Sequence, residues 1–106
     1  MLPNLPGLRR PYYAYLIELY SPLGGSKHQA RFYLGIARDY LARLAQHRLG
    51  KGAKMLKFAA EREIRFEVVK VWEFTTYYEA RAFESWAKRS VKNHRRLLAM
   101  PTGERI

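Results

Sequence analysis

A strand-like segment followed by a helix-like segment carries residue types that could act together on a charged substrate. The stretch RFYLGIARDYLARLAQH places Tyr33, Gly35, Arg43 and His47 within fifteen residues. A planar guanidinium suits phosphate or carboxylate groups, and an imidazole can carry a proton near neutral pH. Because Arg43 and His47 are four residues apart on the expected helix, we expect them to share an exposed face. The alternative is an ordinary strand packed against a helix.

The charge of the chain favours a polyanionic partner. Lys and Arg number 20 and Asp and Glu number 9, which gives a net charge of +11. Nucleic acid is the first candidate partner, an anionic membrane surface is the second, and a basic protein without such a partner is the third possibility. Residues 42–60 and 85–100 form two basic blocks without a single acid, which suits a phosphate backbone. No expected helix pairs a wholly basic face with a strongly apolar one, so we expect no membrane partner.

The composition excludes several other classes of protein. The 106 residues suffice for one domain with one core, and there is no cysteine. Disulfides, thiolate metal sites and cysteine nucleophiles are therefore excluded, which fits a reducing compartment. The proline-broken N-terminus lacks the apolar run of a signal peptide. No apolar stretch approaches the roughly 20 residues of a membrane span.

Residue alternation and turn residues predict three strands. Residues 12–20 and 30–37 are rich in aromatic and branched residues, and the glycines and proline between them indicate an antiparallel hairpin. Residues 64–74 form the third expected strand. Tyr33 alternates with apolar neighbours, so we expect its side chain on the opposite face of the sheet.

Capping residues and apolar spacing predict the helices. Asp39 is the expected N-cap and Gly50 the expected stop of a first helix. Its expected apolar stripe consists of Leu41, Leu44, Ala45 and Leu49. Residues 51–63 indicate a second, short helix.

A last helix is expected after the third strand. Thr76 and Glu79 form the pattern of a capping box before residues 80–93, and the helix continues or frays towards Pro101. Its expected core stripe consists of Ala80, Phe83, Ala87 and Val91. Glu84 lies at the edge of that stripe.

This order of elements predicts one small α+β domain. Two strands, two helices, a strand and a helix would place helices around a three-stranded antiparallel or mixed sheet. We expect the domain over residues 11–98, a flexible N-terminal tail at 1–10 and a C-terminal tail at 99–106. We find no internal repeat and no second domain.

Several short motifs stand in a fixed order along the chain. YAY occupies residues 13–15 and YLG occupies 33–35, with Arg43 ten residues and His47 fourteen residues after the YLG tyrosine. GKGAK follows at 50–54, and EARAFE ends at Glu84. This set resembles the GIY-YIG nuclease domain, in particular its small single-domain bacterial members, over residues 12–93. The first motif lacks the family's glycine, and MLKFAAERE stands where those members often carry a YTRGR-like stretch.

The resemblance implies hydrolysis of phosphodiester bonds with one divalent metal ion, Mg²⁺ or Mn²⁺. Glu84 would bind the metal, Arg43 would clamp a phosphate oxygen, and Tyr33 would deprotonate or orient the attacking water. A tyrosine has an ordinary pKa of about 10, so nearby cations must acidify one that acts as a base. Tyr15 would orient water or phosphate, and His47 would assist proton transfer or hold a phosphate. Expected nucleic-acid contacts are Lys51, Lys54, Lys57, Lys88, Arg89 and Lys92.

Two functions of different classes follow from these observations. The first is a metal-dependent DNA endonuclease of the bacterial cytoplasm, structure-specific or weakly sequence-specific. The second is a catalytically inactive nucleic-acid-binding domain on the same fold, which the altered stretch after Lys54 favours. RNA stays open as a substrate, as does a protein partner or homodimer that supplies specificity. A DNA repair role stays open beside a mobile-element or defence role.

Overall fold

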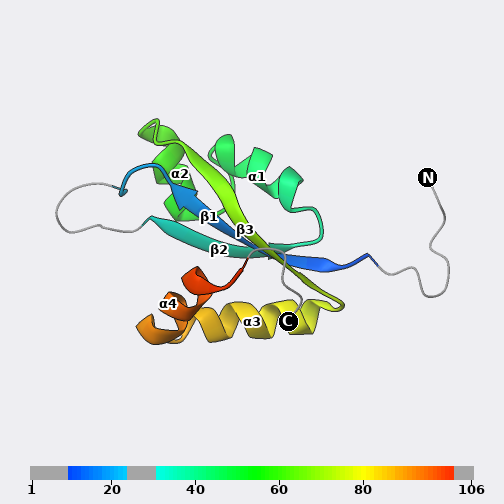
Figure 1. Ribbon diagram of the computed structural model, residues 1–106. Coiled ribbons are helices and arrows are strands. Elements are labelled where there is room, and N and C mark those ends of the chain that lie inside the picture. Colours follow the sequence, from blue (N-terminus) through cyan, green and yellow to red (C-terminus); the bar gives the residue numbers. More distant parts are fainter. Residues whose placement is uncertain (1–9, 24–30, 102–106) are drawn as a thin grey trace.

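A single sheet lies between two layers of helices in the computed structural model, which describes residues 10–23 and 31–101 (Figure 1). The elements are β1 (Tyr12–Leu19), β2 (Phe32–Ala37), α1 (Tyr40–Arg48), α2 (Lys54–Glu61), β3 (Phe66–Phe74), α3 (Tyr77–Lys88) and α4 (Val91–Ala99). The α+β class is confirmed, and α4 adds one helix to the expected order. Most of the two expected tails, residues 1–9 and 102–106, lies outside the described residues.

β1 is the central strand of the sheet. The strand order is β2-β1-β3, and β1 pairs antiparallel with both neighbours, which confirms the expected hairpin. Helices cover both faces of this strand, so residues 14–17 are buried at every position. β2 and β3 are the two edges.

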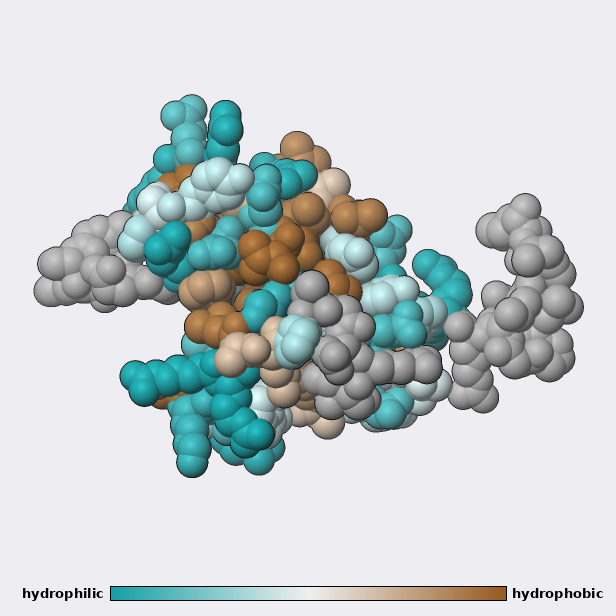
Figure 2. Space-filling view, in the orientation of Figure 1, coloured by the Kyte–Doolittle hydropathy of each residue, from teal (hydrophilic) through white to brown (hydrophobic). Residues whose placement is uncertain are grey.

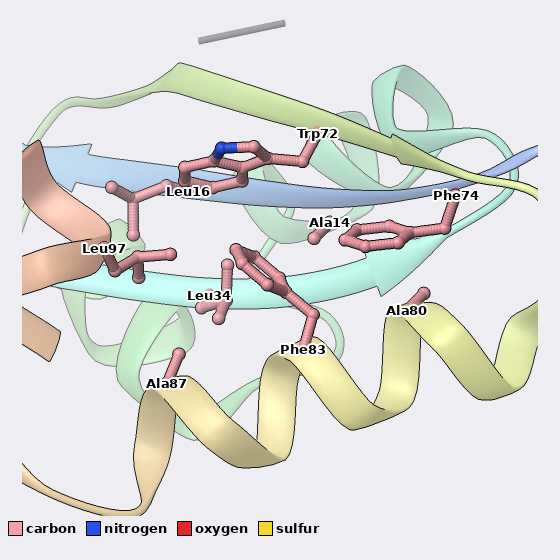
Figure 3. Close-up of a cluster of buried hydrophobic side chains, with 9 residues drawn as sticks. All are labelled: Ala14, Leu16, Leu34, Trp72, Phe74, Ala80, Phe83, Ala87 and Leu97. Carbon is pink, nitrogen blue, oxygen red and sulfur yellow. The ribbon is translucent and has the colours of Figure 1, made fainter. Parts of the chain in front are cut away.

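The pleat of β1 sends alternate side chains into two separate cores. Tyr15, Ile17 and Leu19 point towards α1 and α2. Ala14 and Leu16 point towards α3 and α4. In the second core, a side chain of α3 projects into the space between the helix and the strands (Figure 3). That side chain is Phe83, whose ring centroid lies 5.1 Å from that of Trp72 and 5.2 Å from that of Phe74.

The exposed edge at β3 carries a bulge. Leu16 pairs with Lys70 and Ile17 pairs with Val68, so Val69 is the extra residue. The Lys70 ammonium donates to the carbonyls of Leu98 and Met100, the second at 2.8 Å. These carbonyls belong to the end of α4, where backbone acceptors lack helical partners. The bulge and the inward lysine make this edge a poor template for pairing with another strand.

α1 buries a different stripe from the one expected. The inward residues follow the helical spacing of Tyr40, Arg43, Leu44 and His47. Leu41 and Leu49 are 63% and 74% exposed, and His47 is fully buried. The expectation that His47 shares an exposed face was therefore wrong, as were three of the four expected core positions. The reason is that the polar residues of α1 find partners at the sheet, so the helix turns them inward.

The expected helix caps are confirmed. The Asp39 carboxylate accepts a hydrogen bond from the backbone N–H of Ala42 at 3.0 Å. Thr76 and Glu79 form both halves of the capping box. Gly50 follows the end of α1 with φ of 77°, a left-handed conformation that ends a helix.

The last helix is interrupted, contrary to expectation. α3 ends at Lys88, and the Ser90 side chain caps α4 by accepting from the backbone N–H of Asn93 at 3.1 Å. Asn93 in turn donates from Nδ2 to the carbonyl of Trp86 at 2.8 Å. Val91 is 70% exposed because the break turns it away from the core, so its expected core position was wrong.

The two basic blocks lie on opposite sides of the sheet. The first becomes α1 and α2, and the second becomes the end of α3 with α4. Strongly hydrophilic residues gather over α4 and the end of α3 in the space-filling view (Figure 2). No described helix combines the length and the apolar character that crossing a membrane requires.

The Lys70 contacts lead to a stability prediction. Lys70→Met keeps most of the aliphatic stem but leaves the carbonyls of Leu98 and Met100 without this donor. We expect the free energy of unfolding, measured by urea denaturation, to fall by about 1–3 kcal/mol. Lys92→Met changes an exposed lysine of α4 and should cost less than about 0.5 kcal/mol. Equal losses in the two variants would contradict a special role for Lys70.

Candidate active site

Two tyrosines from neighbouring strands begin the site. Tyr15 lies opposite Gly35 and Ile17 lies opposite Tyr33 in the antiparallel register. Both tyrosines therefore face α1, as the alternation of β2 predicts for Tyr33, and their ring centroids are 6.3 Å apart. A Cβ atom on Gly35 would lie 2.4 Å from the Tyr15 hydroxyl oxygen. The glycine is thus required by the close passage of this phenol over β2.

His47 connects Tyr15 to the loop after α1. Its Nε2 lies 3.1 Å from the Tyr15 hydroxyl oxygen, and its Nδ1 lies 3.2 Å from the carbonyl oxygen of Lys51. A carbonyl only accepts, so Nδ1 carries the proton and donates. In a neutral imidazole, Nε2 is then the acceptor for the Tyr15 hydroxyl.

The GKGAK segment closes over this histidine. Gly52 has φ of 94°, and a Cβ atom there would lie 3.1 Å from Cε1 and Nδ1 of His47. The segment therefore supplies a backbone carbonyl and a close-packed backbone wall. Of the expected phosphate contacts, Lys51 reaches the histidine through its carbonyl.

Arg43 lies beside the two tyrosines. Its side chain is partly buried, and Nη1 donates to the Gln46 side-chain oxygen at 3.1 Å. Its Nη2 lies near the backbone of Gly52. The guanidinium is therefore held between α1 and the loop, close to the phenols of Tyr15 and Tyr33.

Glu84 approaches from the opposite layer of helices. Its residue is 9% exposed, although it lies at the edge of the α3 stripe as expected. Oε1 accepts from Arg81 at 2.6 Å and Oε2 accepts from Lys88 at 3.1 Å. The Lys88 ammonium also lies 5.9 Å from the centroid of the Tyr33 ring. The carboxylate therefore joins the tyrosines beside the narrow edge strand β2.

The electrostatic surroundings act differently on the tyrosines and the histidine. Burial, and next the negative charge of Glu84, raise the pKa of Tyr33, while the positive charge of Arg43 acts against this. Burial, followed by the proximity of Tyr33, likewise raises the pKa of Tyr15. Burial lowers the pKa of His47, which agrees with a neutral imidazole. In this arrangement Tyr33 is protonated at neutral pH.

A metal ion would find one carboxylate here. The described residues contain no group of three or more His, Cys, Asp and Glu side chains that could hold a metal. Glu84 offers two hard oxygen atoms, but each already accepts from a cation. Both of those cationic side chains are more than half exposed, so they are free to move away. The donor set fits a cation that takes its other ligands from water and substrate.

The structure separates the expected residues into two groups. Tyr15, Tyr33, Arg43, His47, Glu84, Lys88 and the backbone of Lys51 lie together. Within the described part of the chain, no hydrogen bond, ion pair or ring contact joins Lys54, Lys57, Arg89 or Lys92 to the five expected catalytic residues.

Sequence reasoning missed two parts of the site. The first is the passage of Tyr15 over Gly35, which needs the strand register. The second is the carbonyl of Lys51 as the partner of His47. The glycines on both sides of Lys51 were the available signal, because paired glycines often mark a close approach of the backbone.

The comparison with protein-family models agrees with the motif pattern. The family model of the GIY-YIG catalytic domain matches residues 11–97, which is most of the chain. Neither the comparison with curated proteins nor that with solved structures found a match.

The contact between Tyr15 and Gly35 predicts a strongly coupled pair. Gly35→Ala should lower the free energy of unfolding by about 1–3 kcal/mol, because the new methyl group overlaps the phenol. In a Tyr15→Leu background, the same change should cost less than about 0.5 kcal/mol. Urea denaturation of the four proteins in this cycle measures the coupling. Additive effects would contradict the close passage.

The buried histidine predicts a pH-dependent stability. The folded chain holds the His47 proton less tightly than the unfolded chain, so the stabilisation is present above about pH 6.5 and is lost as the pH falls. The free energy of unfolding should be smaller at about pH 5.5 than at about pH 7.5, and His47→Gln should reduce this difference. His94→Gln serves as the control and should keep the wild-type difference. An unchanged difference in His47→Gln would contradict the prediction.

Proposed function

The chain belongs to the GIY-YIG catalytic domain family, a family of nucleases, and we propose that it is a divalent-metal-dependent endonuclease of DNA. The observation that carries this proposal is the meeting of five side chains from four elements. Tyr15 comes from β1, Tyr33 from β2, Arg43 and His47 from α1, and Glu84 from α3. Tyr15 and His47 are buried, so Tyr33, Arg43 and the cations around Glu84 are the groups that a phosphate would meet.

The cationic side chains of the site are suited to binding a phosphate group. Arg43 is positioned by Gln46 and presents a planar fork of donors that suits two phosphate oxygens. Lys88 and Arg81 lie at the rim with exposed side chains. These three cations would stabilise the negative charge that grows on the phosphate during hydrolysis.

Glu84 would hold Mg²⁺ or Mn²⁺. When bound, such a cation would neutralise charge on the phosphate and stabilise the leaving oxygen. Because Glu84 is the single expected protein ligand, binding to the protein alone should be weak. The proposal is supported by the hard oxygen donors and by the exposed cations, which can exchange the carboxylate for a phosphate.

The hydrogen-bonded side chains suggest a route for the proton of the attacking water. Tyr33 is the more exposed of the two tyrosines and would contact that water. With Tyr15 donating to Nε2 of His47, the Tyr33 hydroxyl would turn to donate to Tyr15; as the Tyr33 oxygen accepts the water proton, its own proton would pass to Tyr15 and the Tyr15 proton to His47. Such a relay forms no free phenolate, which suits the raised pKa of Tyr33, and it leaves a proton on His47, whose lowered pKa would make that imidazolium short-lived.

The basic surface around the site is suited to binding nucleic acid with little dependence on base sequence. The two basic blocks lie on both sides of the site, and phosphate contacts carry no base information. We therefore propose structure-specific or weakly sequence-specific cleavage. A protein partner or a second copy could add specificity. The altered stretch after Lys54 forms α2, with Leu56 and Ala59 buried in the core, so it contributes to the fold itself.

Nicking of supercoiled plasmid DNA tests this function. With Mg²⁺ or Mn²⁺, the wild-type protein should nick the plasmid, and a chelator should abolish nicking. Glu84→Gln and Tyr33→Phe should each lower the rate roughly 10²- to 10⁴-fold. Glu61→Gln makes the same chemical change as Glu84→Gln at an exposed position of α2 and should retain wild-type activity.

The pattern of results separates the alternatives. Nicking that survives in Glu84→Gln would overturn the site assignment. If no variant nicks DNA but the wild-type protein binds it with strong salt dependence, the chain is a nucleic-acid-binding domain instead. Replacing the plasmid by an RNA of the same sequence tests whether DNA is the substrate.

A further inference from the structure

Four residues near the start of α3 form a cluster that the proposed chemistry does not use. The Arg38 guanidinium lies 4.7 Å from the centroid of the Tyr12 ring. The rings of Tyr12 and Tyr77 meet edge to face at 5.5 Å, and those of Tyr77 and Tyr78 do so at 5.7 Å. We call these four residues the stacking cluster.

The outer rings of the stacking cluster are open to solvent. Tyr12 is partly buried and packs against the core between the sheet and α3, so it anchors the cluster. Tyr77 is 43% exposed and Tyr78 is 81% exposed. The Tyr78 ring therefore buries little apolar area in the fold, and both rings offer flat surface to a ligand.

The stacking cluster lies in line with the catalytic carboxylate. Tyr77, Arg81, Glu84 and Lys88 follow at helical spacings of three and four, so they share one side of α3. At 1.5 Å per residue, Tyr77 lies about 10 Å from Glu84 along the helix axis.

The position of Arg38 after β2 gives a similar distance between the stacking cluster and the site. Arg38 follows Gly35 by three residues, which is also about 10 Å along an extended chain. The beginnings of β1 and α3 lie at one end of the molecule (Figure 1). A distance of about 10 Å corresponds to about three stacked nucleotides.

Exposed aromatic rings beside an arginine are suited to nucleobases that are free of a duplex. Ring stacking on a base needs access to the flat face of that base, and in a duplex the neighbouring base pairs cover both faces. The Arg38 guanidinium adds a positive charge for the adjoining backbone and a second flat surface.

We propose that the stacking cluster binds an unpaired base about three nucleotides from the phosphate at Glu84. The preferred substrate is then single-stranded DNA or the unpaired arm of a branched DNA. The proposal rests on the proposed nuclease function and deepens it by naming the class of substrate.

Binding can be measured without cleavage in the Glu84→Gln protein. Fluorescence anisotropy with a labelled single-stranded oligonucleotide and with the duplex of the same sequence gives both affinities. Tyr78→Ala and Tyr77→Ala should each weaken single-strand binding roughly 5- to 150-fold and change duplex binding less than about twofold. Tyr78→Phe keeps the ring and should keep the affinity.

Tyr20→Ala is the matched control. Tyr20 is 58% exposed and follows the other end of β1, so the same truncation is made away from the cluster. It should leave both affinities unchanged. Circular dichroism and thermal melting of every variant establish that each one folds. A position-specific readout comes from 2-aminopurine placed at successive nucleotides, whose fluorescence should be quenched at one or two neighbouring positions in a Tyr78-dependent way.

Each outcome decides for or against the stacking cluster. Unchanged single-strand affinity in Tyr78→Ala, equal losses for both DNAs, or an equal loss in Tyr20→Ala would overturn the proposal. The nuclease function fails separately. A chain that nicks no DNA but shows the selective tyrosine effect has the stacking cluster without the activity, and a chain that nicks DNA without this effect has the activity alone.

Discussion

The buried contact between Tyr15 and His47 is the constraint on which the site depends. A phenol and an imidazole withdrawn from water must satisfy each other, because an unpaired buried donor or acceptor costs about 1–3 kcal/mol. Their contact requires the bare backbone of Gly35 under the phenol and the carbonyl of Lys51 behind the imidazole. It also requires α1 to turn its polar residues inward. The YLG motif, the GKGAK motif and the orientation of α1 are therefore all needed for this one hydrogen bond.

Because the sheet has only three strands, side chains from its two faces can meet beside one of its edges. A central strand would separate Tyr33 on one face from Glu84 on the other. β2 is an edge strand, so Glu84 passes beside it, and Lys88 bridges from the carboxylate to the ring of Tyr33. The opposite edge, at β3, is occupied by a bulge and by Lys70. The two edges therefore differ, and the candidate site residues gather at the edge that is free of a bulge.

Local rules were sufficient where local contacts decide the structure. Asp39 and Thr76 cap their helices as expected, and alternation places Tyr33 correctly. Apolar spacing failed on α1, where His47 turns inward to hydrogen-bond Tyr15 and the Lys51 carbonyl while Leu41 and Leu49 stay exposed. It failed again at Val91, where the Ser90 cap interrupts a helix that composition alone would continue. The family resemblance supplied the long-range grouping of the site, which no local pattern contains.

In the proposed reaction, the charged groups around Glu84 couple the binding of the metal ion to the binding of DNA. The carboxylate is held by Arg81 and Lys88, so a metal ion must compete with both cations. A phosphate offers the same cations another anionic partner, and it offers the metal additional oxygen ligands. DNA should therefore raise the affinity for metal, and by thermodynamic reciprocity metal should raise the affinity for DNA. A single-carboxylate site with two exposed cations is thus suited to binding its metal together with the substrate rather than before it.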